Sequence, residues 1–156
     1  MLDEIKTIDQ EVSPNPALHD PVTGLLNRNS LHELLNNEIA RAERFHEKFA
    51  VVVLEIENLS NIILEFGDAA GKHILKTIAM FLKTELRNYD LLYRHQENQF
   101  LIIMPKIKLN ETVERIRQLT QDIKNSIGSM PINHCQLSQQ RQALPVIQLM
   151  LKVSLA

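Results

Sequence analysis

Apolar residues recur at helical and extended intervals along the chain, and these intervals predict its first elements. Apolar residues spaced three and four apart predict a helix that Asn29 or Ser30 caps and that runs to about Phe45. The continuous apolar run FAVVVLEIE, residues 49–57, is rich in β-branched side chains. Such a run is typical of a central strand buried on both faces.

Two glycines interrupt the helical pattern that follows this strand. NLSNIILEFG is a short helical piece that ends at Gly67, and a longer helix is expected from about Ala69 to Leu86. Because Gly67 and Gly71 lie between the two helical pieces, we expect them to form a corner rather than to bind phosphate.

The second half of the chain predicts a hairpin, a helix and two more strands. LLYRHQENQFLIIMP, residues 91–105, places two apolar runs around a short polar stretch and predicts the hairpin. Asn110 is expected to cap a helix that ends at Gly128. Residues 132–138 predict an edge strand, and after a polar tip at residues 139–141 the run VIQLMLKVSL returns as a strand.

This order of elements mixes a βα crossover with antiparallel hairpins. It predicts an α+β fold, with helices flanking a central sheet that contains antiparallel strands, close to a ferredoxin-like core. The 156 residues suit one domain, which we place at residues 17–156. Residues 1–16 form an N-terminal amphipathic segment or linker in this interpretation.

The N-terminal segment has its own apolar stripe, which Pro14 and Pro16 end. Its spacing of three and four residues fits a helix with Leu2, Ile5, Ile8 and Val12 on one side. The segment is either a tail that packs on its own domain or part of a coupling helix or dimer seam.

Composition narrows the classes of protein. A net charge of -2 without a long basic run, and only 4% aromatic residues with no Trp, argue against a nucleic-acid partner. The single cysteine, Cys135, fits a reducing compartment. No apolar run approaches the about 20 residues of a membrane span. We therefore expect a cytoplasmic protein.

Two acidic residues at the end of the first strand are a candidate metal site. Glu55 and Glu57 are two residues apart, so their carboxylates share a face of the strand. Carboxylates bind Mg²⁺, and Glu97 can add a third donor. The alternative is two solvated acids at a strand edge.

The stretch RNYD, between a helix and the hairpin, is a candidate ligand site. Arg87 can grip a phosphate or a guanine edge bidentately, and Asp90 can accept hydrogen bonds from guanine. The alternative is a surface salt bridge that ties the end of the helix to the strand.

Several motifs together resemble the GGDEF domains, the diguanylate cyclases. DPVTGLLNR at 20–28 resembles the family's N-terminal motif DxLTGLxNR. VVVLEIENLSNIILEFGDAAGKHIL, NYDLLYRHQENQFLIIMP and VIQLMLKVSLA then match later family blocks in order. The resemblance covers about residues 17–156. It implies a GGDEF or nucleotidyl-cyclase-like fold, in which two facing domains with Mg²⁺ join two GTP molecules into cyclic di-GMP.

Set against the family pattern, the chain departs from it at the catalytic positions. The signature G-G-D-E-F is replaced by Gln96, Glu97, Asn98, Gln99 and Phe100. Glu55 stands for the early metal-binding Asp, and Ile63 and Leu64 stand for the guanine-reading Asn and Asp. The resemblance therefore implies a degenerate domain that is not an enzyme. Glu55, Glu57, Glu97, Asn98 and Gln99 are then a vestigial active site, without bound metal and with neither Mg²⁺ nor GTP as cofactor.

One ligand site of the family is retained, namely the product-binding R-x-x-D five residues before the signature. Arg87 and Asp90 match it, and Arg115 or Arg117 can supply the further arginine that the family takes from the next helix. This implies a receptor for cyclic di-GMP. The alternative is a protein-interaction or dimerisation module that binds no nucleotide.

The chain stops after the late strand, where the family normally continues with a helix and a strand. Unless these follow in a longer protein, we expect exposed apolar surface at Leu149, Leu151 or Val153, and hence a homodimer or a partner protein.

Overall fold

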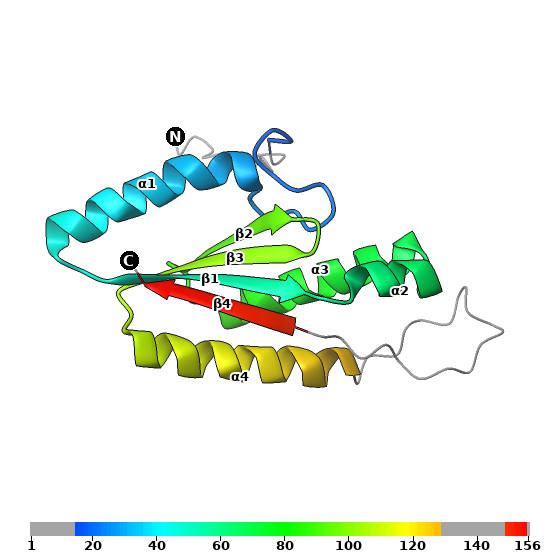
Figure 1. The fold of residues 1–156 in the computed structure, drawn as a ribbon. Coiled ribbons are helices and arrows are strands. Elements are labelled where there is room, and N and C mark those ends of the chain that lie inside the picture. Colours follow the sequence, from blue (N-terminus) through cyan, green and yellow to red (C-terminus); the bar gives the residue numbers. More distant parts are fainter. Residues whose placement is uncertain (1–14, 129–148, 156) are drawn as a thin grey trace, which may run out of the picture.

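The computed structural model describes residues 15–128 and 149–155. The elements in chain order are α1 (Arg28–Phe45), β1 (Phe49–Ile56), α2 (Leu59–Phe66), α3 (Asp68–Glu85), β2 (Leu91–Gln96), β3 (Gln99–Pro105), α4 (Leu109–Gly128) and β4 (Leu149–Leu155). The predicted α+β fold is confirmed, as are the central strand, the helix pair and the hairpin (Figure 1).

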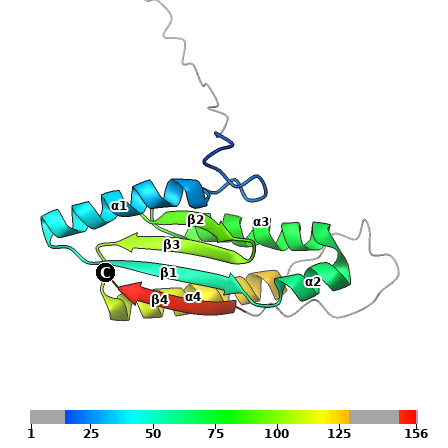
Figure 2. The same cartoon turned by 45° about the horizontal axis from the view of Figure 1, so that its top comes forward.

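The four strands form one sheet in the order β2-β3-β1-β4, and every neighbouring pair is antiparallel. This is the strand order of a ferredoxin-like core, with α1 added before it. Helices α3 and α4 cover one face of the sheet, and α1 lies along the β2 edge on the other face (Figure 2).

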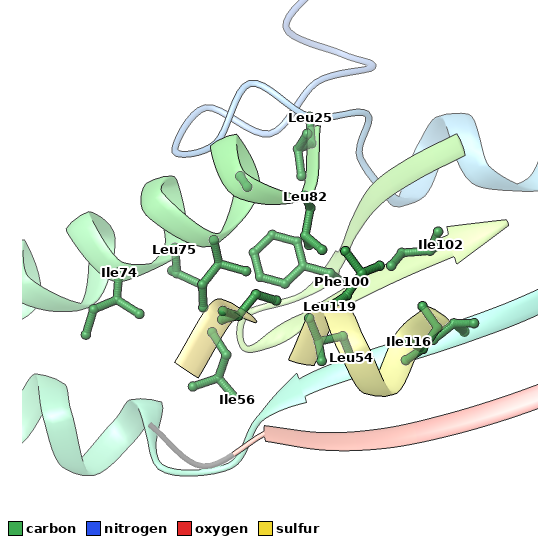
Figure 3. Close-up of a cluster of buried hydrophobic side chains, with 14 of the residues drawn as sticks. Leu25, Leu54, Ile56, Ile74, Leu75, Leu82, Phe100, Ile102, Ile116 and Leu119 are labelled. Atoms are coloured by element: carbon green, nitrogen blue, oxygen red, sulfur yellow. The ribbon is translucent and has the colours of Figure 1, made fainter. Parts of the chain in front are cut away.

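The core divides into two clusters because β1 is buried on both faces. Ala50, Val52, Leu54 and Ile56 belong to a cluster with residues of α3 and α4 (Figure 3). Phe49, with Val51 and Val53 packed against it, belongs to a second cluster beneath α1. The alternation follows from the two-residue period of a strand, and it confirms the predicted central strand.

Two helix starts differ from the prediction. The N-cap of α1 is Asn27, whose side chain accepts a hydrogen bond from the Asn29 backbone N–H. Asn29 and Ser30 already lie inside the helix. Helix α4 begins at Leu109, so Asn110 lies in its first turn rather than capping it.

Gly67 occupies the corner that the sequence predicts, whereas Gly71 lies inside α3, near its start. Gly67 has a φ of +89° and joins α2 to α3, a conformation that favours glycine. Gly71 is buried, and a Cβ added there would lie 2.5 Å from Cγ1 of Ile63. Gly71 therefore allows α2 and α3 to approach closely.

Some expectations lie outside the described residues. They are the N-terminal helix before Asn15, the strand at 132–138, the tip at 139–141, and the side-chain exposure of Leu149, Leu151 and Val153. Among the helices that the structure describes, none is long and apolar enough to cross a membrane.

Candidate functional sites at the two ends of strand β2

The N-terminal motif DPVTGLLNR builds the outer edge of β2. Asp20 Oδ2 accepts hydrogen bonds from the Thr23 backbone N–H at 2.8 Å and its hydroxyl at 2.7 Å. Gly24, with a φ of +69°, completes this turn. The Leu26 carbonyl then accepts from the Arg94 backbone N–H at 2.8 Å. The motif thus covers the free edge of β2, the strand that leads to the turn at the signature positions 96–100 (the signature turn).

A buried arginine, Arg94, contacts two residues of the signature turn. Arg94 is 9% exposed, and its guanidinium carbon lies 5.1 Å from the centroid of the Phe100 ring. Its Nη2 donates to the Glu97 carbonyl. Burial lowers the pKa of Arg94, and the charges of Asp20 and Glu97 oppose this shift. Sequence reasoning missed this residue, although a cation inside an apolar strand was a visible signal.

The signature turn holds the carboxylate of Glu55 with two amides. The Nδ2 atom of Asn98 donates to Glu55 Oε1 at 3.2 Å, and Gln99 Nε2 donates to Glu55 Oε2 at 3.0 Å. The register explains this arrangement, since Glu55 pairs with Gln99 across β1 and β3. Each oxygen of the carboxylate therefore has an uncharged donor.

The other two acids of the candidate metal site do not join Glu55. Glu57 and Glu97 are exposed to solvent. Among the described residues, no group of three or more His, Cys, Asp or Glu is placed to hold a metal ion. The candidate cluster of Glu55, Glu57 and Glu97 is therefore not formed in this structure.

The two apolar residues at the guanine-reading positions of the family lie on α2. Ile63 packs against the core, whereas Leu64 is 85% exposed. Neither side chain offers a hydrogen-bonding group to a base.

At the opposite end of β2, Asp90 both closes a turn and keeps a free acceptor. Its Oδ2 accepts from the Arg87 backbone N–H at 2.9 Å, whereas its Oδ1 is buried without a hydrogen-bond partner. Burial raises the pKa of Asp90, while the Arg87 N–H and the charges of Arg87 and Arg115 oppose the shift. Asp90 therefore closes the turn with one oxygen and leaves the other oxygen without a hydrogen-bond partner.

The side chain of Arg87 does not form the salt bridge considered from the sequence. Its Nη1 donates to the Tyr89 hydroxyl at 3.1 Å, and its guanidinium carbon lies 5.8 Å from the centroid of that ring. The sequence reasoning missed Tyr89, whose hydroxyl takes one of the five N–H donors of this guanidinium.

Arg115 of α4 joins Arg87 in a groove of about 550 Å³. Its Nη2 donates to the Glu85 carbonyl at 2.6 Å, and its Nε is buried without a partner. The structure thus brings Arg115, rather than the exposed Arg117, to the RNYD stretch. The full lining is Glu85, Arg87, Asn110, Glu111, Glu114, Arg115, Gln118, Leu119 and Asp122.

Comparison with known families identifies the class of protein. The profile of the family described as "Diguanylate cyclase, GGDEF domain" matches residues 17–140, most of the 156-residue chain. The chain belongs to the GGDEF family.

Two curated relatives are named as cyclases. The chain is 36% identical to diguanylate cyclase DgcP of Pseudomonas aeruginosa over 117 residues, which are 75% of this chain and 17% of that protein. It is 28% identical to diguanylate cyclase DosC of Escherichia coli over 123 residues, which are 77% of this chain and 27% of DosC. The chain thus spans less than a third of either relative.

Solved structures share the fold. The GGDEF domain of DgcB from Caulobacter crescentus, in complex with c-di-GMP, has a TM-score of 0.76 at 18% identity, covering 91% of this chain and 79% of that one. Diguanylate cyclase SiaD of Pseudomonas aeruginosa, in complex with its activator SiaC, has a TM-score of 0.72 at 23% identity, covering 90% and 50%. Both confirm the expected cyclase-like architecture.

Proposed function

We propose that the chain is a catalytically inactive GGDEF domain that binds cyclic di-GMP through Arg87, Asp90 and Arg115. The observation that carries this proposal is a pair of buried, unpartnered polar atoms: Nε of Arg115, which lines the groove, and Oδ1 of Asp90, whose carboxylate feels the charges of the lining residues Arg87 and Arg115. Buried polar groups without partners are uncommon in folded proteins, and a ligand is one reason to keep them.

The chemistry of these atoms fits a guanine nucleotide. The free oxygen of Asp90 can accept from the N–H groups of guanine, and the guanidinium groups of Arg87 and Arg115 can donate to phosphate or to the guanine acceptors. A groove of this volume lies within the range of small-molecule sites. The DgcB domain, crystallised with c-di-GMP, is a member of the family that holds such a ligand.

The loss of catalysis is supported by the other end of β2. Cyclase chemistry needs Mg²⁺, which prefers charged oxygen ligands. Here the positions of two signature acids carry amides, and those amides already donate to Glu55. The relatives named as cyclases do not settle the matter, because this chain departs from the family at the signature itself.

Isothermal titration of the chain with cyclic di-GMP tests the receptor function. We expect binding in the wild type, and a loss of about tenfold or more in D90N and R115Q, because each loses a charge-assisted hydrogen bond. R117Q removes an equivalent charge from the exposed face of α4 and should bind like the wild type. No heat of binding at ligand concentrations up to roughly 0.1 mM would contradict the proposal.

The D90N variant also separates function from folding. Because burial raises the pKa of Asp90, its ionisation costs stability as the pH rises through that raised value. An asparagine keeps the acceptor for the Arg87 N–H without the charge. D90N should therefore melt at neutral pH no lower than the wild type while losing the ligand. A fall in both would indicate a structural role alone.

A second candidate, a protein-interaction module, is favoured by apolar side chains on the surface. Phe45 of α1, Leu64 of α2 and Met80 of α3 are 60%, 85% and 70% exposed. Exposed apolar surface is typical of contact sites. Sedimentation at rising protein concentration distinguishes this candidate, since a chain that stays monomeric would argue against self-association.

A further inference from the structure

The groove beside Arg87 and Arg115 is lined by more acidic than basic side chains. Four carboxylates face two guanidinium groups. The acids are Glu85 of α3 and Glu111, Glu114 and Asp122 of α4. A binding site for an anion normally has the opposite balance.

These carboxylates are not neutralised by ion pairs within the described part of the chain. The ion pairs found there join Arg41 to Glu38 and Glu47, Lys106 to Glu47, and Lys72 to Asp68. Among the lining acids, Asp122 accepts hydrogen bonds from the uncharged Gln118 at 3.2 and 3.3 Å. Their negative charges therefore remain to act on a ligand.

The spacing of the acids on α4 concentrates this charge. Glu111, Glu114 and Asp122 recur at helical intervals, so one face of the helix presents them together to the groove. A groove of about 550 Å³ is small enough that every lining charge lies near the ligand. Such charges interact strongly at low ionic strength, where the Debye length is about 30 Å, and less at physiological salt, where it is about 8 Å.

We propose that this acidic lining makes the binding of cyclic di-GMP strengthen as ionic strength rises, the reverse of an ordinary anion site. The inference rests on the proposed receptor function. Cyclic di-GMP carries two phosphodiester charges, which the acids repel over the whole groove. Arg87 and Arg115 are themselves half-buried and would contact the phosphates directly, so salt screens the repulsion more than the attraction. Glu114 is the acid that most simply reports the effect, because it is exposed and lies beyond the first turn of α4.

The experiment measures the Kd of cyclic di-GMP for the full chain at about 20 mM and about 200 mM salt. The wild type should bind about threefold more tightly at the higher salt. E114Q should bind about two- to fivefold more tightly than the wild type at low salt, and its salt dependence should be weaker. E33Q, which removes an exposed acid from α1 on the other face of the sheet, serves as the matched control and should behave like the wild type.

The outcomes separate this inference from the proposed function. Binding that weakens with salt, or an E114Q variant with the wild-type affinity, overturns the electrostatic inference and leaves the receptor function standing. Absence of binding at both salt concentrations, in the wild type and in E114Q, overturns both.

Discussion

At the scale of single residues, the signature turn shows how amides can occupy positions where the family carries acids. Glu55 sits against Asn98 and Gln99, and each of its oxygens receives an N–H donor. A second and a third carboxylate at this place would repel Glu55 unless a cation or a proton came between them. The present residues form a self-contained set of hydrogen bonds that needs neither.

The double variant N98D/Q99E tests this arrangement. Replacing both donors by acids should lower the free energy of unfolding by about 1–3 kcal/mol at neutral pH, because Glu55 loses its partners and gains like charges. Thermal melting with and without Mg²⁺ measures the effect. Mg²⁺ should restore part of the loss in the variant and leave the wild type unchanged.

A surface change of the same chemistry serves as the control. N37D adds one acid at an exposed position of α1 and should change neither stability nor the response to Mg²⁺. Wild-type stability in the double variant, or stabilisation of the wild type by Mg²⁺, would contradict this account of the turn.

The sequence allowed the replaced residues to be named but not their contacts. Asn98 and Gln99 lie 43 and 44 positions from Glu55, and only the β1–β3 register brings them together. For the same reason the sequence left Arg115 and Arg117 as alternatives. The pitch and placement of α4 decide which arginine faces the groove, and these depend on packing rather than on local pattern.

At the scale of elements, β2 joins the two candidate sites. It begins one residue after Asp90 and ends at Gln96, the first residue of the signature turn. Six residues of strand separate the sites by about 20 Å. Strand β2 therefore helps to position Asp90 even where the residues of the signature turn have changed.

The α2–α3 pair is a second element whose packing can be tested. G71A should destabilise the fold by about 1–2 kcal/mol, because the added Cβ would overlap Ile63, and the gain in helix propensity offsets only part of this cost. Chemical denaturation measures the change. In the background of I63A the same substitution should be neutral or favourable, because the overlapping atoms are gone. An equal loss in both backgrounds would contradict the proposed close approach.

Periodicity predicted the elements well and their ends less well. The apolar spacing located α1, β1, α3 and the hairpin, because each buries a face with its own period. The caps were misplaced because Asn27, Asn29, Ser30 and Asn110 are all chemically able to cap a helix. Which one does so depends on the preceding turn, where Asn27 Nδ2 also donates to the Ala17 carbonyl at 3.0 Å.

At the scale of the whole molecule, the sheet places the two sites at opposite ends and leaves them chemically different. One end carries a turn whose acid is satisfied by amides, and the other carries unpartnered polar atoms beside an open groove. The sequence predicted the class of fold and its helical layers. The expected ferredoxin-like core has the strand order that the structure shows.

The most direct test is an NMR titration of the ¹⁵N-labelled chain with cyclic di-GMP, because it reports both binding and its location. We predict changes in the amide resonances of residues 85–91 and of the half of α4 that lines the groove. The amides of residues 96–99 and of Glu55 should stay unchanged. Changes centred on the signature turn, or no change anywhere, would contradict the proposal that the domain has kept its ligand site and lost its catalytic site.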